Sequence, residues 1–225
     1  MSDNERDRLL QTILANVAFD GWTRRCLEDA ARQEGLPPGK IDVLFPGGPR
    51  SAIEAFSHWA DEQMLAAVEG NRVAFDGMRI REKIAFLVEG RLRALEPHRE
   101  AVRRSLAVLA MPTNAGLASK LLYRAVDAMW RAAGDRSTDY NFYTKRVLLA
   151  GVYSSTQLYW LNDRSDDCTD SWSFLARRIE GVLKVGPRVG KLVGKAGKLS
   201  EMPFRVAASL RERVSSFRRT EPQEG

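Results

Sequence analysis

The stretch DAARQEGLPPGKIDVLF, residues 29–45, says more about the fold than any other short segment. It starts with small residues at the end of a predicted helix, and Gly35 then marks a turn. Gly39, Ile41 and Phe45 predict a short helix after that turn. An amphipathic helix over residues 4–17 precedes the stretch, so residues 1–50 are expected to form a helix-turn-helix-like module.

Helical spacing of apolar residues continues beyond this module, while clean alternation of apolar and polar residues is rare. Glycine and proline separate the periodic segments. These patterns predict an all-α chain with a helical body over residues 51–186 and a tail over residues 187–225. The expected body helices cover residues 51–69, 78–95, 98–111, 116–133, 139–161 and 172–185, with Ser51 as the N-cap of the first.

Residues 5–60 resemble, in layout, the DNA-binding end of TetR-type repressors, which also carry an all-helical ligand-binding body. The resemblance implies a TetR-like helical bundle. Because the module looks poorly suited to DNA, we expect a vestigial helix-turn-helix. A basic amphipathic segment would follow at the C-terminus.

The chemistry of the module argues against specific DNA binding. Pro37 and Pro38 remove two backbone N–H donors from the turn, and Asp42 lies in the short helix that would meet phosphates. Residues 1–50 contain 7 basic and 8 acidic side chains, whereas a DNA-reading module needs a positive face. A TetR-type transcription regulator therefore stays an alternative and not the main interpretation.

The excess positive charge lies in the tail. Residues 184–225 contain 10 Lys and Arg against 4 Asp and Glu, whereas residues 1–183 contain 25 of each. On a helix, basic and apolar residues of the tail fall on separate faces, which is typical of a segment that binds an anionic membrane surface. A disordered basic tail is the alternative, since glycines weaken a helix. The predicted membrane-binding residues are Lys184, Arg188, Lys191, Lys195, Lys198, Leu210 and Phe217.

The run Val147–Leu161 contains no charged side chain and, at 15 residues, is shorter than the ~20 needed to span a bilayer. A helix without a charged face is usually central, so we expect other helices on all its sides. Its polar groups either bond backbone carbonyls within a filled core or line a ligand cavity. The cavity is expected between helices at about residues 84–95, 102–111, 117–130 and 147–161. The candidate lipid-binding residues are Leu148, Val152, Tyr153, Thr156 and Tyr159.

Catalytic and metal-binding patterns are missing from the sequence. His58 and His98 lie on different predicted helices, and neither has a cysteine nearby. Phosphate-binding glycine motifs and a nucleophile elbow are absent too. We therefore expect no enzyme activity, no cofactor and no metal. Cys26 and Cys168 are far apart and fit a reducing compartment.

Four motifs resemble the ubiquinone-biosynthesis accessory protein of the coenzyme Q pathway, the ninth COQ component. They are FDGW (19–22), FPGGP (45–49), PHREAVRR (97–104) and WRAAGDRSTDYNFYTKR (130–146), and the likeness covers residues 7–186. The resemblance implies a non-enzymatic protein that binds isoprenoid quinone-like lipids, docks on membranes and presents substrate to a hydroxylase of the ubiquinone pathway. A phospholipid is the alternative ligand. The protein is also a candidate to form a homodimer. By position, the implied hydroxylase-binding residues are Met129, Asp139, Phe142, Tyr143 and Arg146.

Residues 139–146, DYNFYTKR, are expected to begin a helix and to display an exposed aromatic patch. Phe142 stands where relatives often have Trp. The alternative is that these aromatics fill the core. The polar N-terminus resembles neither a signal nor a transit peptide, so we expect a bacterial protein, cytoplasmic and peripheral on the inner membrane. A helical protein-interaction module without lipid is the remaining alternative function.

Overall fold

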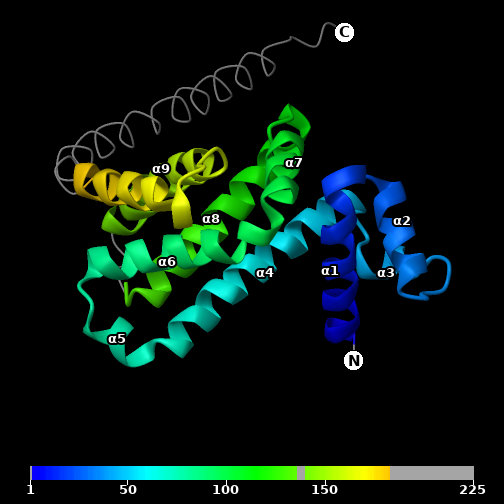
Figure 1. Ribbon diagram of the computed structural model, residues 1–225, viewed down its shortest axis with the longest axis horizontal. Helices are drawn as coiled ribbons and strands as arrows, with labels where there is room; N and C mark the ends of the chain where they lie inside the picture. Colours follow the sequence, from blue (N-terminus) through cyan, green and yellow to red (C-terminus); the bar gives the residue numbers. More distant parts are fainter. Residues whose placement is uncertain (1, 136–139, 183–225) are drawn as a thin grey trace, which may run out of the picture.

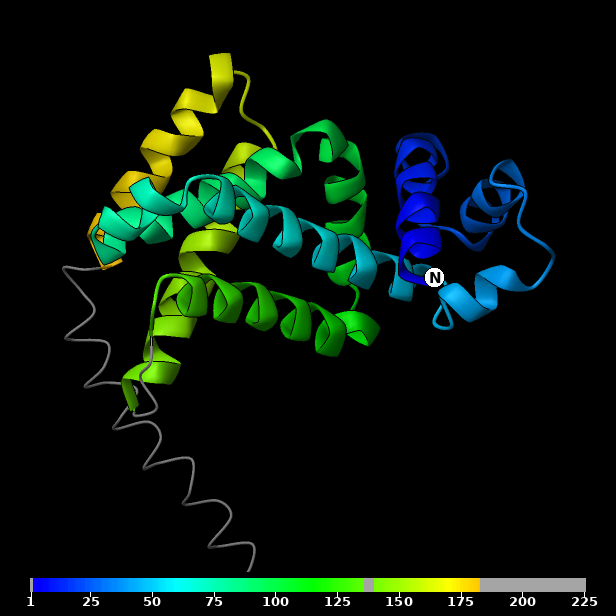
Figure 2. The same ribbon diagram turned by 90° about the horizontal axis from the view of Figure 1, so that it is seen from below.

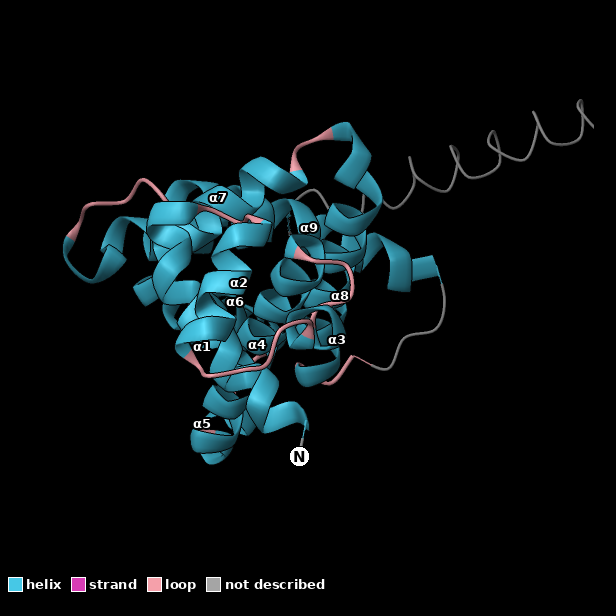
Figure 3. Ribbon diagram, turned by 90° about the vertical axis from the view of Figure 1, so that its right-hand side faces the viewer, coloured by secondary structure: helices cyan, strands magenta, loops and turns pink. Residues whose placement is uncertain are grey.

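The chain folds into two groups of helices joined by one long helix (Figure 1). The computed structural model describes residues 2–135 and 140–182. Those residues form helices, turns and loops without a strand, as the colouring in Figure 3 shows. The all-α prediction is therefore confirmed.

Three helices make the N-terminal module: α1 (Ser2–Asp20), α2 (Arg24–Gln33) and α3 (Lys40–Leu44). Their apolar faces meet in a filled core that contains Leu9, Ile13 and Phe45, all with 0% exposure. Full burial of each such side chain contributes about 1.5–3 kcal/mol. The Thr23 hydroxyl accepts a 3.1 Å hydrogen bond from the Cys26 amide and so caps α2.

Helix α4 (Pro49–Gly70) runs from this module into the body (Figure 2). Its observed start differs from the predicted one. Gly48, with φ of 59°, is the N-cap, and Pro49 occupies the first turn because its fixed φ and missing N–H suit that position. Ser51 therefore lies inside the helix, where its hydroxyl accepts a 2.8 Å bond from the Gly47 amide, and the prediction of Ser51 as N-cap is wrong.

The body packs its helices against α4, which contacts both α6 and α8. Helix α5 is absent from the sequence prediction because it is short and flanked by glycines; Phe75, 1% exposed, anchors it to the core. The body elements are α5 (Arg72–Gly77), α6 (Ile80–Ala94), α7 (Arg99–Leu109), α8 (Ala115–Ala132), α9 (Tyr140–Trp160) and a helix over residues 169–182, with 3-10 turns at Glu96–His98, Pro112–Asn114 and Asp166–Cys168.

Helix α9 is not surrounded on every side, which corrects the expectation drawn from the uncharged run Val147–Leu161. Trp160 is fully buried, but Val147 is 64% exposed and Leu158 57% exposed. Its hydroxyls divide between the two interpretations. Ser155 and Thr156 donate to backbone carbonyls at 2.7 and 2.8 Å, as in a filled core. Other polar residues of α9 face cavities, which are described below.

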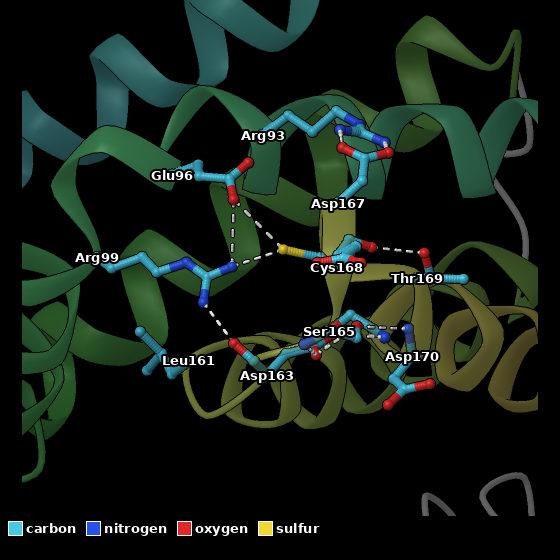
Figure 4. A network of polar contacts seen from close by, with 12 residues as sticks. Arg93, Glu96, Arg99, Leu161, Asp163, Ser165, Asp167, Cys168, Thr169 and Asp170 are labelled. Carbon is cyan, nitrogen blue, oxygen red and sulfur yellow. Dashed lines mark hydrogen bonds and ion pairs between the residues drawn. The ribbon is translucent and has the colours of Figure 1, made fainter.

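The connection after α9 is held by a polar network that reaches α6 and α7 (Figure 4). Arg93 forms a bidentate pair with Asp167, and Arg99 donates to the Asp163 carbonyl at 2.9 Å. Arg103 donates to the Leu161 carbonyl at 2.8 Å. Arg99 and Arg103 thus satisfy backbone carbonyls in the turn that follows α9. The connection is thereby fastened to the α6–α7 corner.

Asp163 organises the same loop and begins the helix over residues 169–182. Its carboxylate accepts from the amides of Ser165 and Ser171, both at 2.8 Å. Burial of Asp163 raises its pKa, but hydrogen bonds from the two serines outweigh burial and hold the pKa at about 2. Asp166 and Asp167 do not cap this helix with their side chains, because Asp163 supplies the acceptor and Asp167 pairs with Arg93.

Candidate ligand-binding cavities

Cavity 1 is a largely apolar cavity of about 460 Å³ between α4, α6, α7, α8 and α9. Its volume lies in the range of about 300–1,000 Å³ usual for small-ligand sites. It reaches the surface at Ala110 and Leu158, which line it and are exposed. The cavity lies between the helices at which a ligand cavity was expected, with α4 as an additional wall. Its apolar lining includes Ile53, Phe56, Leu95, Val102, Leu106, Leu109, Leu121 and Leu122.

One wall of cavity 1 is polar and comes from three helices. Arg91 on α6 is only 4% exposed, and its guanidinium donates to the Asp61 carboxylate at 2.8 Å. The same guanidinium donates to the Ser57 carbonyl at 3.2 Å and to the Ser57 hydroxyl at 3.0 Å. It also donates to the hydroxyl of Tyr153 on α9. Ser57, Arg91 and Tyr153 all line the cavity.

The Asp61 carboxylate bridges two arginines. Its second oxygen accepts from Arg124 at 3.2 Å, and Arg124 also contacts the His58 ring. Burial, with Arg124 as a secondary cause, lowers the pKa of His58, so the ring is neutral at pH 7. Burial likewise raises the pKa of Tyr153 and keeps its hydroxyl protonated. Two cations therefore share one anion in this group, of which Asp61, Arg91 and Tyr153 are buried.

Cavity 2 is larger, about 830 Å³, and lies between the start of α6, the end of α8, the start of α9 and the last described helix. Its rim includes Arg79 and Arg81, both exposed, and Ile80, which is 49% exposed. Apolar side chains form much of its interior, namely Ile84, Trp130, Leu148, Leu149, Val152, Ile179 and Val182.

The charges beside cavity 2 form a separate cluster. Arg146, 3% exposed, pairs with Asp127 at 2.7 Å and with Asp135 at 3.5 Å. Lys145 pairs with Asp135 at 2.8 Å, and its backbone carbonyl accepts a 3.1 Å bond from the Trp130 indole. This cluster ties the end of α8 to the start of α9.

The predicted lipid-binding residues do not share one cavity. Leu148 and Val152 line cavity 2, whereas Tyr153 lines cavity 1. Thr156 is fully buried and donates to the Val152 carbonyl. Tyr159 is 39% exposed and stacks on Phe174 at 4.6 Å between ring centroids. The expectation of one shared site is corrected because α9 turns different faces towards the two cavities.

The predicted hydroxylase-binding residues are also divided. Met129 has 0% exposure and belongs to the core, so its expected place in an exposed patch is wrong. The Arg146 guanidinium is likewise buried, and it pairs with Asp127 at 2.7 Å and with Asp135 at 3.5 Å. Asp139 lies outside the described residues, and Phe142 and Tyr143 belong to the first turns of α9. Their role in partner binding stays a prediction.

Several further expectations concern the tail or an absence. The predicted membrane-binding residues, from Lys184 to Phe217, lie outside the described residues. Within the described part of the chain, every helix is too short or too polar to cross a membrane. Residues 2–135 and 140–182 also bring no three His, Cys, Asp or Glu side chains together as a metal site. Cys26 and Cys168 are both buried and free.

The helix-turn-helix region has little free positive charge on its short helix. Asp42 on α3 forms an ion pair with Arg24 of α2 at 2.7 Å. The pairing neutralises a cation that a DNA-reading surface would direct at phosphates. It agrees with the module being poorly suited to DNA.

Sequence reasoning missed the polar wall of cavity 1. One signal was available, since Arg91 follows Leu87 by four residues and therefore shares its buried face. Ser57 and Asp61 are likewise four residues apart on α4 and therefore share one face of that helix. A charge on an apolar face indicates a buried partner, but it does not say which helix supplies that partner.

These features define a class: an all-α, TetR-like protein with an apolar cavity inside its helical body. A solved TetR transcriptional regulator from Nitrosomonas europaea superposes with a TM-score of 0.65, covering 79% of this chain and 97% of that chain at 22% sequence identity. The superposition shows a shared fold and, at this identity, the fold alone. The TetR-like expectation is therefore confirmed.

The relatives are more specific. Residues 115–186 match the family model described as COQ9. The chain is 32% identical to the mitochondrial ubiquinone biosynthesis protein COQ9 of Homo sapiens, over 80% of this chain and 58% of that protein. It is 43% identical to COQ9-B of Xenopus laevis, over 80% and 63%. The chain thus spans about three fifths of the length of these relatives. The resemblance to COQ9 that the motifs predicted is therefore confirmed.

Proposed function

We propose that this protein is a non-enzymatic accessory factor of ubiquinone biosynthesis that binds an isoprenoid quinone-like lipid. The apolar cavity 1 within a COQ9-related helical body is the observation that carries the proposal. A cavity of this size and lining favours a ligand that is mostly hydrocarbon. Lipids of the ubiquinone pathway have that character, and the named function of the relatives supports this choice.

The packing around cavity 1 favours ligand binding over the alternative of a filled core. Large apolar side chains from five helices surround space that they do not fill, although protein interiors normally pack at crystal-like density. Exposed Ala110 and Leu158 at its mouth offer a route for the long chain of a lipid. A phospholipid acyl chain is an alternative occupant with the same apolar chemistry.

The proposal includes delivery of the lipid to a hydroxylase of the same pathway. The candidate contact residues are Phe142 and Tyr143, in the first turns of α9. Because α9 also lines both cavities, a partner bound at its start would lie next to a helix that contacts the ligand. The tail would hold the complex at an anionic membrane surface through its basic residues, and a second copy of the chain would complete a homodimer.

Lipid extraction tests the main claim. Purified full-length protein should carry a lipid that is detected by native mass spectrometry and identified after organic extraction. Ala118 lines cavity 1, whereas its neighbour Ser119 is exposed and does not. Ala118→Trp should fill the cavity and abolish co-purification, whereas Ser119→Trp should retain the lipid. Absence of lipid from the wild-type protein, or its retention at full occupancy by Ala118→Trp, would contradict the proposal.

Vesicle flotation tests the tail. Full-length protein should float with anionic vesicles, and a 1–183 truncation should stay at the bottom of the gradient. Salt should weaken flotation of the full-length protein, since the attraction is electrostatic. Equal flotation of the two forms would mean that the body and not the tail contacts the membrane.

A further inference from the structure

The polar wall of cavity 1 has more hydrogen-bond donors than acceptors. Arginine offers five N–H donors and no acceptor. Four donations of Arg91 are accounted for, to Asp61, to Tyr153 and twice to Ser57, which leaves one N–H at the Tyr153 end of the guanidinium.

The two hydroxyls of the wall each retain a donor as well. Ser57 and Tyr153 both use an oxygen lone pair to accept from Arg91. Within the described part of the chain, Arg91 is the hydrogen-bond partner of both hydroxyls, and neither O–H hydrogen has an acceptor. Tyr153 is 3% exposed, and Ser57 is half-buried at the edge of the apolar cavity. Donors without an acceptor are costly where they are shielded from water.

The charges of the wall point in the same direction. Asp61 is shared by Arg91 and Arg124, while His58 and Tyr153 are neutral. The nearby Lys120 and Glu54 neutralise each other at 2.6 Å. The group therefore keeps a net positive charge beside an apolar cavity, where electrostatic interactions are less screened than in water.

We infer that cavity 1 binds its ligand by an oxygen acceptor, held by the hydroxyls of Ser57 and Tyr153 and by the Arg91 guanidinium. This inference rests on the proposed function and specifies the ligand. It is an amphiphile that enters with a carbonyl, ether or carboxylate oxygen at the polar wall and leaves its apolar chain towards Ala110 and Leu158. A plain hydrocarbon fills the same space but leaves the donors unpaired.

The experiment compares three probes of similar apolar size on full-length protein freed of lipid. They are a decyl-substituted benzoquinone with neutral carbonyl acceptors, dodecanoate with a carboxylate, and decylbenzene without oxygen. Dissociation constants are measured by equilibrium dialysis. The wild-type protein should bind at least one oxygen-bearing probe tenfold or more tighter than decylbenzene. Whichever of the two binds more tightly identifies the acceptor as a carbonyl or a carboxylate.

Tyr153→Phe and Ser57→Ala should each reduce this oxygen preference by threefold or more and leave decylbenzene binding unchanged. Tyr159→Phe and Ser155→Ala are matched controls, since neither residue lines cavity 1, and both should keep the wild-type preference. Circular dichroism verifies folding, and Ser57→Ala carries the test alone if Tyr153→Phe does not fold.

Equal binding of all three probes by the wild-type protein would overturn the inference while leaving the proposed lipid binding intact. Equal weakening of all three probes by the variants would also overturn it, because it would mean that the wall only maintains the structure. Failure of every probe to bind would contradict the proposed function itself, and the inference with it.

Discussion

Cavity 1 and cavity 2 share helix α9 but differ in how their charges are held. Cavity 1 has Arg91 at its centre, joined to Asp61 on α4 and to Tyr153 on α9. Cavity 2 has Arg79 and Arg81 on an exposed rim, and the buried pair beside it, Arg146 and Asp127, joins α8 and α9. The difference teaches that one helix, α9, can serve both a polar-walled internal site and an open, basic-rimmed one.

Removal of the Asp61 carboxylate, which Arg91 and Arg124 share, should give the largest loss of stability. Asp61→Ala leaves Arg91 and Arg124 without their common anion, and Arg91 is almost fully buried. We expect the free energy of unfolding to fall by about 3–5 kcal/mol. Urea denaturation followed by circular dichroism measures it.

Asp127→Ala provides the comparison at cavity 2. Arg146 keeps Asp135 as a partner, so the loss should be smaller, about 1–3 kcal/mol. If the two substitutions cost the same, or Asp127→Ala costs more, the contrast between the cavities is wrong.

The loop after α9 should contribute to the stability of the helices around cavity 1. Its network reaches α6 and α7, which are walls of that cavity. Asp163→Ala removes the acceptor for Ser165 and Ser171 and should lower the free energy of unfolding by about 1–3 kcal/mol. Asp166→Ala, an exposed neighbour, should stay within about 0.5 kcal/mol of the wild type. A larger effect of Asp166→Ala would mean that the loop is organised differently.

The same loop predicts a pH dependence. The pKa of Asp163 is about 2 in the folded chain, below its ordinary 3.8. A depressed carboxylate pKa stabilises the folded state above the unfolded value and loses that contribution as pH falls through the folded value. The stability difference between wild type and Asp163→Ala should therefore be constant above about pH 5 and shrink between about pH 4 and pH 2. Denaturation curves across this range measure it, and a constant difference down to pH 2 would contradict the assignment.

At the start of α9, Phe142→Ala or Tyr143→Ala should weaken hydroxylase binding by more than ~1 kcal/mol, as aromatic hot spots do. Calorimetric titration with the ubiquinone-pathway hydroxylase provides the measurement, and an unchanged melting temperature shows that the fold survives. Normal binding by both folded variants would place the partner surface elsewhere. Unfolding of both would assign the two aromatics to the core.

The smallest effect should come from the ion pair outside cavity 1. Lys120 lies 2.6 Å from Glu54, but its side chain is 62% exposed. Lys120→Ala should therefore cost less than about 1 kcal/mol, because water screens exposed pairs. A loss as large as that of Asp61→Ala would show that Glu54 and Lys120 belong to the buried network.

Much of the fold was predictable from local patterns. Periodicity gave the approximate ranges of the long helices, and the 29–45 stretch indicated the N-terminal module. The misses were local events without a periodic signal, such as the start of α4 at Pro49 and the short helix around Phe75. Both depend on single turns, where one proline or one buried ring decides the outcome.

The candidate site was predictable only in part. The bundle between α6, α7, α8 and α9 was expected to be hollow, and Tyr153 was among the predicted lining residues. The split of α9 between two cavities and the burial of Met129 and Arg146 were not foreseen. Helical spacing identifies residues on one face, but it does not say how closely a neighbouring helix approaches that face.

The sequence by itself determined that this chain is helical, that its net positive charge lies in the tail and that its N-terminal module has no excess of basic residues. These properties follow from composition and from spacing within one helix. Only the tertiary structure decided that Ser57, Arg91 and Tyr153 meet at one wall, because they come from three helices. Arg91 is 34 residues from Ser57 and 62 residues from Tyr153 in the sequence. Such a meeting depends on packing between helices and on the space that side chains leave unfilled, which no local pattern encodes.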